Sequence, residues 1–330
     1  MTRSAIFWPI LLLAFVLLFN LFFTPGFLDL EFRDGRLFGS LVDIVNRSAP
    51  VLLLSLGMTL VVATGGVDLS VGAVMAIAGS VAAGLISRPT GFLLSQLPVQ
   101  SVVGIVAVSL LIAMACGLFN GVLVGFFRVQ PIVATLILMV AGRGVAMLLT
   151  DGQIITFTNP QFAAIGSGAT LSLPNPIWIS MLAAALVGVL TRTTAFGLFV
   201  EAVGDNPRAA DGVGIDSRTV KLAIYAISGV CAGIAGLIGA ADIRAADANN
   251  AGLYLELDAL LAVAIGGTSM AGGRFSLAGS ILGAVLMQAV TTTILTRGVP
   301  PEATLILKAL IVVGVCLAQS PEFARKWRTV

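Results

Sequence analysis

The sequence predicts an all-α, polytopic membrane protein, and its composition carries that prediction. Among 330 residues, 18 are basic and 16 acidic, so 10% are charged, whereas soluble domains carry roughly 25%. Hydrophobic residues make up 58% of the chain, and the mean hydropathy is +1.06. A soluble fold has too little interior to hide this much apolar surface, so we expect lipid to surround most of the chain.

The same composition argues against several other classes of protein. The net charge of +2 is too small for nucleic-acid binding by bulk electrostatics. Histidine is absent, which removes the commonest metal ligand and the usual acid–base catalyst. Cys116, Cys231 and Cys316 lie singly in apolar runs without metal-ligand spacing, so we expect small buried side chains. We therefore expect neither an enzyme nor a metal site.

Ten apolar runs are candidates for crossing the membrane, because a helix needs ~20 residues to span the hydrocarbon layer. Arg143 and Lys308 are the only charges inside these runs. The first run has no good cleavage site after it, so we expect a retained helix. The runs cover residues 5–23, 48–64, 70–87, 101–126, 131–150, 176–190, 222–241, 259–269, 277–295 and 304–320. We expect about ten transmembrane helices in a single domain over residues 1–330.

The distribution of Lys and Arg in the loops predicts that both termini are cytoplasmic. With the N-terminus inside, the cytoplasmic segments hold more basic residues than the outside segments. The clearest contrast is between the C-terminal tail, with Arg325, Lys326 and Arg328, and the outside loop 151–175, which has no Lys or Arg. An even number of crossings then returns the chain to the cytoplasmic side.

Two of the runs, 48–64 and 259–269, are short or interrupted by glycine. The repeated pattern is Gly65-Gly66 followed by Gly72, and Gly266-Gly267 followed by Gly273. Interrupted segments of this kind offer backbone polar groups at membrane depth and mark substrate sites in many transporters. We therefore expect broken helices at both positions.

Residues 191–221 are the most polar stretch that this topology places in the cytoplasm. Asp205 or Asn206 can cap a helix that begins at Pro207 and stops at one of the glycines that follow. A short capped helix outside the membrane can dock on a soluble partner and pass on rigid-body motion. It can equally be a solvated connector that folds back on the bundle, and the residues alone leave both interpretations open.

Several motifs, taken in order, resemble one family. Residues 201–207, with 209–210 and 214–215, are similar to the coupling loop of ATP-binding-cassette importer permeases, in the branch that takes up ribose, galactose, galactofuranose and related sugars. Within that branch, residues 34–40 and 240–252 are most similar to galactofuranose permeases. The other matching segments are 64–72, 120–121, 131–136, 256–259, 266–269 and 272–273.

The resemblance implies a single permease domain in the bacterial inner membrane. A cytoplasmic ATPase would dock on the 191–221 loop, a periplasmic sugar-binding protein on the outer face, and a second copy or sibling permease would complete a dimer. The chain has no Gly-x-x-x-x-Gly-Lys-Ser/Thr phosphate loop, so we expect it to hold no cofactor, with ATP bound by the partner alone. The implied coupling residues are Glu201, Ala202, Gly204, Asn206, Pro207, Arg208, Ala209 and Gly214.

A neutral sugar needs hydrogen-bonding groups at membrane depth, where unpaired polar side chains are costly. Asp68 and Ser70 are expected to line the pathway, to cap the following helix, or to do both. Asn120 can face the pathway or bond a neighbouring helix, and we favour the second interpretation. Thr268 and Ser269 are their counterparts after the second glycine pair.

The remaining polar candidates are charged. We expect Arg143 to form a structural ion pair, with Asp68 as the proposed carboxylate. Glu256 and Asp258 open the eighth run from the outside, where they can contact the binding protein or cap the helix. The competing hypothesis is an ion- or proton-coupled secondary sugar transporter, which commonly has titratable groups in mid-membrane. This chain has few such groups, so we favour the permease.

Overall fold

The computed structural model describes residues 2–33, 35–87, 97, 99–300, 303–306, 308–310 and 313. The helices are α1 (Thr2–Phe23), α2 (Ser40–Ala63), α3 (Val71–Ser87), α4 (Val102–Gly125), α5 (Pro131–Leu149), α6 (Pro160–Ser167), α7 (Asn175–Thr193), α8 (Ala195–Asp205), α9 (Pro207–Gly212), α10 (Ser217–Ile243), α11 (Leu255–Ile265) and α12 (Leu277–Thr296). The short strands are β1 (Glu31–Arg33), β2 (Arg36–Phe38), β3 (Ile155–Thr156), β4 (Ala169–Thr170), β5 (Leu173–Pro174) and β6 (Ala245–Ala246).

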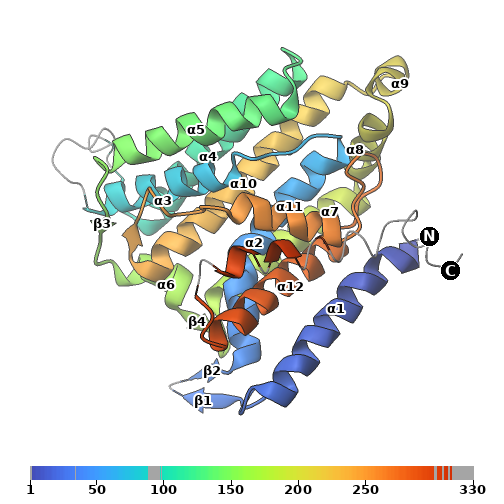
Figure 1. Cartoon of the computed structure of the whole chain (residues 1–330). Helices are drawn as coiled ribbons and strands as arrows, with labels where there is room; N and C mark the ends of the chain where they lie inside the picture. Colours follow the sequence, from blue (N-terminus) through green and yellow to red (C-terminus); the bar gives the residue numbers. More distant parts are fainter. Residues whose placement is uncertain are drawn as a thin grey trace, which may run out of the picture.

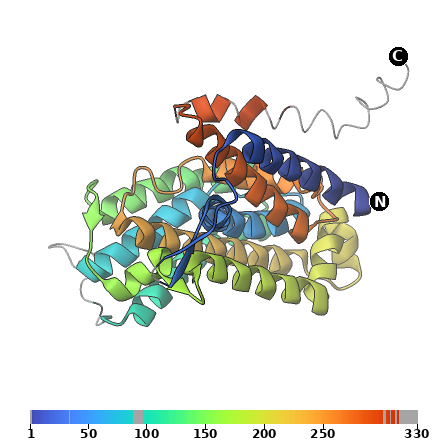
Figure 2. The ribbon, with the colours of Figure 1, turned by 90° about the horizontal axis from the view of Figure 1, so that it is seen from below.

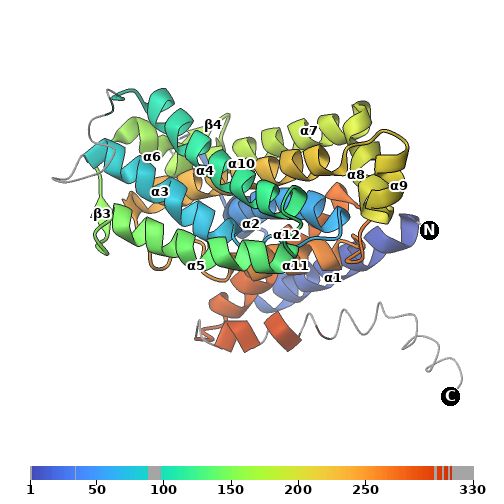
Figure 3. The ribbon, with the colours of Figure 1, turned by 90° about the horizontal axis from the view of Figure 1, so that it is seen from above.

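The long helices form one bundle whose two ends differ. Figure 1 shows α8 and α9 at the end where the N-terminus lies, and α6 with β1 to β4 toward the other end. The view from above shows the same separation (Figure 3). The strands pair antiparallel as β1 with β2, β4 with β5, and β3 with β6. The β3–β6 pair joins the loop after α5 to the loop after α10.

The core is built around α2 and α10. Helix α2 packs against α7, α10, α11 and α12, and α10 packs against α3 and α4. Almost every residue from Ser48 to Ala63 of α2 is buried. A helix that is apolar on all sides is expected at the centre of a bundle, where no face meets water. Helix α1 lies at the periphery against α12 (Figure 2). On the outer helices, Phe22, Val140 and Leu148 are 79%, 73% and 79% exposed, which suits a lipid environment.

Helices α4 and α10 approach each other closely along a row of glycines. A Cβ on Gly121 would lie 2.9 Å from the Cα of Leu222, and a Cβ on Gly125 would lie 3.0 Å from the carbonyl oxygen of Arg218. Gly117 lies one turn earlier on the same face and also meets α10 backbone. Small residues at this spacing allow two membrane helices to pack backbone against backbone.

The fold class predicted from the sequence is confirmed, but a count of ten crossings is not. Each predicted run up to residue 295 overlaps a described helix, and α2 begins at Ser40 rather than at residue 48. Seven described helices are long and apolar enough to cross a membrane: α1, α2, α4, α5, α7, α10 and α12. Helix α3 has 17 residues and α11 has 11, so both are short.

Some predictions fall on residues outside the described part of the chain. These are Asp34, residues 307, 311–312 and 314–320 of the tenth run, which include Cys316, and the basic residues of the C-terminal tail. Of the other two cysteines, Cys231 is buried in α10 and Cys116 is half-buried in α4. Cys231 therefore agrees with the expected small core side chain, and Cys116 agrees in part.

Candidate functional site: two helix breaks and a peripheral helix pair

Helices α8 and α9, residues 195–212, form what we call the peripheral helix pair. The side-chain oxygen of Asn206 accepts the backbone N–H groups of Arg208 and Ala209, both at 3.1 Å, and Pro207 occupies the first helical position. Asn206 is therefore the cap of the predicted short helix, and Asp205 is not. The sequence analysis missed α8, which turns this segment into two consecutive helices.

Two aspartates outside the long apolar helices shape the turn between α9 and α10. The Asp211 carboxylate accepts the backbone N–H of Ser217 at 2.9 Å, and this hydrogen bond lowers the pKa of Asp211. The Asp216 carboxylate accepts the Thr219 hydroxyl at 2.5 Å and the Arg218 N–H at 3.1 Å. Both hydrogen bonds lower the pKa of Asp216, and the bond from the Thr219 hydroxyl has the larger effect. Both carboxylates thus fix where α10 begins.

The peripheral helix pair has a face toward the bundle and a face away from it. Val200 and Val203 are fully buried, whereas Leu198 and Val213, just after α9, are 70% and 77% exposed. Of the predicted coupling residues, those that are exposed are Asn206, Arg208, Ala209 and Gly214, and those that are half-buried are Glu201, Ala202, Gly204 and Pro207. The exposed set lies at the α9 end of the pair.

A hollow lies beside α8 at the same end of the bundle. Its volume is about 440 Å³, and its charged lining consists of Arg192, Glu201 and Arg274. Residues 275–277, at the start of α12, complete the wall opposite α8. The hollow is open to the outside of the bundle and could accept part of another protein chain.

The chain unwinds at both glycine pairs, as the sequence predicts. We call residues 64–70, between α2 and α3, the first break, and residues 266–276, between α11 and α12, the second break. Gly65 and Gly267 have φ angles of 75° and 80°, which a residue with a side chain adopts only with strain. Each pair therefore ends a helix and frees backbone polar groups for other bonds.

The first break carries a buried polar group that we call the Asp68 cluster: Asp68, Ser70, Asn120 and Ser228. One carboxylate oxygen of Asp68 accepts the Ser70 N–H at 3.1 Å and the Ser70 hydroxyl at 2.6 Å. The other accepts the Ser228 hydroxyl of α10 at 2.8 Å. The Asn120 amide of α4 donates to the Ser70 hydroxyl at 2.9 Å. All four residues are at most 2% exposed.

These contacts bear on the predictions made for each residue. The Asp68 carboxylate accepts the N–H of Ser70, the residue just before α3, so it holds the turn that leads into the helix. Asn120 does link α4 to the first break. Thr268 and Ser269 lie apart from this cluster. The Thr268 hydroxyl accepts the Ser276 N–H at 3.2 Å, and Ser269 is exposed. A role in a substrate pathway stays a prediction for all five residues.

Sequence reasoning missed Ser228 and Tyr225 of α10. Tyr225 is 1% exposed, and its hydroxyl has no hydrogen-bond partner among the described residues; the Asn120 side-chain oxygen is also unpartnered there. The available signal was a polar residue, Ser228, within a helix otherwise rich in glycine and alanine, and Tyr225 as one of two tyrosines. Neither signal identifies Asp68 as the hydrogen-bond partner of Ser228.

The predicted ion pair between Arg143 and Asp68 is wrong. The Arg143 guanidinium donates to the carbonyl oxygens of Ala248 at 3.0 Å and Ala251 at 2.6 Å, and so fixes the loop after β6 to α5. The carboxylates that interact electrostatically with it are those of Glu256 and Asp247. A charge within an apolar run needs partners, and for Arg143 backbone carbonyls supply them.

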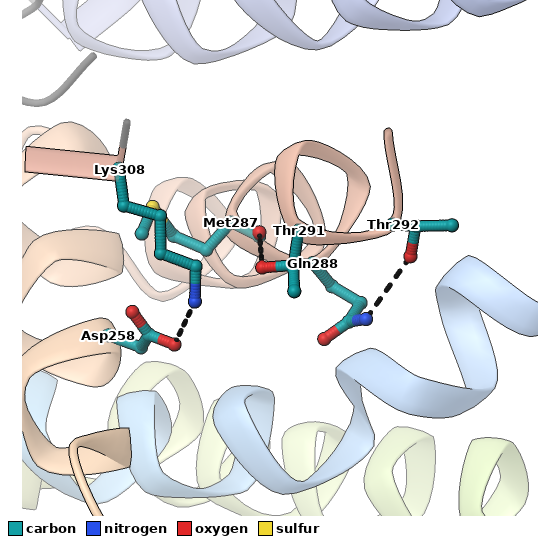
Figure 4. Close-up of polar contacts among 6 residues, drawn as sticks. All are labelled: Asp258, Met287, Gln288, Thr291, Thr292 and Lys308. Carbon is teal, nitrogen blue, oxygen red and sulfur yellow. Dashed lines mark hydrogen bonds and ion pairs between the residues drawn. The ribbon is translucent and has the colours of Figure 1, made fainter. Parts of the chain in front are cut away.

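A binding-protein contact is also wrong for Glu256, which is 4% exposed and lies against Gly72 at the start of α3. Its place in the first turn of α11 agrees with the alternative of a favourable charge at a helix N-terminus. Asp258 instead forms an ion pair with Lys308, with 2.6 Å between Asp258 Oδ2 and Lys308 Nζ (Figure 4). The two side chains are 14% and 11% exposed. Both residues therefore lie within the protein, and the ion pair of Asp258 joins α11 to Lys308.

Interrupted helices inside an apolar bundle, with a helix pair outside it, define a polytopic membrane transport protein. No group of three His, Cys, Asp or Glu side chains that could hold a metal occurs in the described part of the chain. The chain belongs to the family of the branched-chain amino acid transport system / permease component, whose family model matches residues 40–316.

Three relatives with assigned names cover nearly the whole chain. The galactofuranose transporter permease protein YtfT of Escherichia coli K12 is 51% identical over 96% of this chain and 91% of its own length. The fructose import permease protein FruF of Bifidobacterium longum is 39% identical over 96% and 87%. The ribose import permease protein RbsC of Haemophilus influenzae is 32% identical over 94% and 90%. No solved structure matches the chain.

Proposed function

We propose that this chain is the membrane permease subunit of an ATP-driven importer that moves a sugar across the bacterial inner membrane into the cytoplasm. The observation that carries the proposal is the peripheral helix pair, a capped and partly exposed element beside the apolar bundle. The three relatives named above are permeases for galactofuranose, fructose and ribose, which supports a sugar as the substrate. They favour this function over an ion-coupled secondary transporter.

A separate ATPase subunit would bind the exposed end of the peripheral helix pair. Arg208, Ala209 and Val213 offer a charged group beside apolar surface, as a helix-in-groove contact requires. The hollow beside α8, with Glu201 in its lining, could receive a second element of that subunit. The ATPase alone would bind ATP, so this chain would need no cofactor.

The same proposal fixes the orientation. The peripheral helix pair and both termini would lie in the cytoplasm, and loop 151–175 would lie outside, where a sugar-binding protein docks. One sugar pathway would form with a second copy or a sibling permease, each chain contributing a single permease domain. Rigid-body motion of the peripheral helix pairs would then open the pathway alternately to each side.

Galactofuranose is the proposed sugar, and Asp68, Ser70, Asn120, Thr268 and Ser269 are the proposed pathway residues. Four of these five side chains are buried. Their hydroxyl, amide and carboxylate groups match the hydrogen-bonding needs of a neutral sugar, but a sugar could reach the Asp68 cluster only after the surrounding helices separate. The pathway role therefore belongs to an opened conformation.

The test is reconstitution of the chain with its ATPase subunit and sugar-binding protein in vesicles. We expect uptake of galactofuranose that requires ATP. The double variant Arg208→Glu/Val213→Asp should abolish co-purification of the ATPase, whereas Leu171→Asp, at an 81% exposed site in loop 151–175, should leave it intact. Uptake that follows a proton or sodium gradient without ATP would contradict the proposal, as would normal ATPase assembly by the double variant.

A further inference from the structure

Gly204, in the last turn of α8, lies against both helix breaks at once. A Cβ added there would overlap the carbonyl oxygen of Ala63, the last residue of α2, and the backbone nitrogen of Gly273 in the second break. These two groups are bonded to each other, because the Gly273 N–H donates to the Ala63 oxygen at 2.8 Å. The α8 backbone therefore packs directly onto the hydrogen bond that ties the second break to the end of α2.

Neighbouring glycines extend this contact. A Cβ on Gly272 would lie 2.7 Å from the Gly204 oxygen and 3.1 Å from the Gly65 nitrogen. Gly272 and Gly273 have φ angles of 96° and 85°, and a Cβ on Gly273 would overlap the Asp205 carboxylate. We call Gly65, Gly204, Gly272 and Gly273 the glycine junction. Three segments that are remote in sequence meet there through backbone atoms, and the Asp205 side chain lies against Gly273.

Backbone contacts of this kind transmit displacement efficiently. A side chain can change rotamer and absorb a small shift, whereas close-packed backbone has no such freedom. A shift of α8 must therefore move the end of α2 and the second break together, or the junction must open. By contrast, Gly188 in α7 has no atom within 4 Å of an added Cβ.

We propose that Gly204 is a positioning residue that makes the two breaks move as one unit with the peripheral helix pair. This inference rests on the proposed function, because it says which residues receive the motion that the ATPase passes to the peripheral helix pair. It also separates Gly204 from the residues proposed to touch the ATPase: Gly204 faces the breaks, and the α9 end faces the partner. The first break continues from Gly65 directly to the Asp68 cluster, so the same shift reaches the buried polar groups.

The test compares Gly204→Ala with Gly188→Ala in the reconstituted complex. Both variants add one methyl group to a helical glycine, and Gly188 of α7 lies outside the surface proposed to bind the ATPase. For Gly204→Ala we expect normal co-purification of the ATPase, uptake reduced about tenfold, in the range of coupling free energies, and loss of the stimulation of ATP hydrolysis by the sugar-loaded binding protein. Gly188→Ala should match the wild type in all three measurements.

A second measurement keeps the inference open to refutation if Gly204→Ala does not accumulate. Spin labels at Asp205 and Ala271, both exposed, report the distance between α8 and the second break. We expect this distance to stay the same with and without ATP, while a distance from Asp205 to Leu171 changes. A nucleotide-dependent change between 205 and 271, or equal uptake by the two alanine variants, would overturn the inference alone. Absence of ATP-driven uptake by the wild type would overturn the proposed function and this inference with it.

Discussion

Each of the two helix breaks has its own glycine pair, and both breaks contact Gly204. Different groups nevertheless stabilise them. The first break places the Asp68 carboxylate inside the bundle, with hydrogen bonds from Ser70 and from Ser228 of α10. The second break contains no acidic residue and relies on glycine turns, the Thr268 hydroxyl and one backbone bond from Gly273 to Ala63 of α2. Freed polar groups in a membrane helix can thus be satisfied by side chains of neighbouring helices or by turns and backbone bonds. The first solution makes the break dependent on the side chains around it.

The largest difference between the breaks should come from Asp68→Ala. This change leaves the Ser70 N–H and the Ser70 and Ser228 hydroxyls without their acceptor, so we expect a loss of roughly 3 kcal/mol in the free energy of unfolding in detergent. Asp68→Asn keeps one acceptor oxygen and should lose about half as much. Equal stability of the alanine variant and the wild type would show that the carboxylate does not hold the first break.

The ion pair on the helix before the second break should give the next largest effect. Lys308→Met leaves the mostly buried Asp258 carboxylate unpaired, which should destabilise the protein by about 2 kcal/mol. The double variant Lys308→Met/Asp258→Leu removes both charges and should recover most of that loss. Thermal unfolding of the single and double variants measures the difference, and additive losses in the double variant would contradict a direct pair.

Thr268→Val should have a smaller effect than either. It removes one hydrogen bond to the Ser276 N–H, worth about 1 kcal/mol, while the glycine turns of the second break remain. Thr268→Ser keeps the hydroxyl and is the matched control. If Thr268→Val proved as damaging as Asp68→Ala, the proposed contrast between the two breaks would be wrong.

The smallest effect is expected in the peripheral helix pair. Asn206→Ala removes the cap of α9 and should cost about 1 kcal/mol locally, with little change in global unfolding because α9 contributes a single small residue, Ala210, to the core. Asn206→Asp retains the acceptor oxygen and should behave as the wild type. Hydrogen exchange of the Arg208 and Ala209 amides measures the local change, and unaltered exchange in Asn206→Ala would argue against the cap.

The sequence predicted the elements whose signals are local. Apolar length predicted the helices of the bundle, and the Asn206-Pro207 pair predicted where α9 begins. The glycine pairs predicted both breaks. These features depend on properties of neighbouring residues along the chain, which is why composition and spacing were sufficient.

The contacts between remote segments could not be predicted in the same way. Arg143 and Asp68 were paired because both are charges within apolar surroundings, but the fold brings backbone carbonyls to Arg143 and hydroxyls to Asp68. Glu256 was placed at the outer surface because it precedes an apolar run, but the loop after β6 folds inward and buries it. Gly204 looked like part of a partner surface, since spacing does not show which side of α8 meets the breaks.

The cytoplasmic position of the peripheral helix pair is tested most directly by cysteine accessibility. Val213→Cys and Leu171→Cys, at sites 77% and 81% exposed, are compared in a background without the three native cysteines and without the ATPase subunit. With a membrane-impermeant maleimide applied to spheroplasts, we predict labelling of Leu171→Cys and no labelling of Val213→Cys until the membrane is permeabilised. Labelling of Val213→Cys in intact spheroplasts would contradict the proposed orientation and, with it, coupling through α8 and α9.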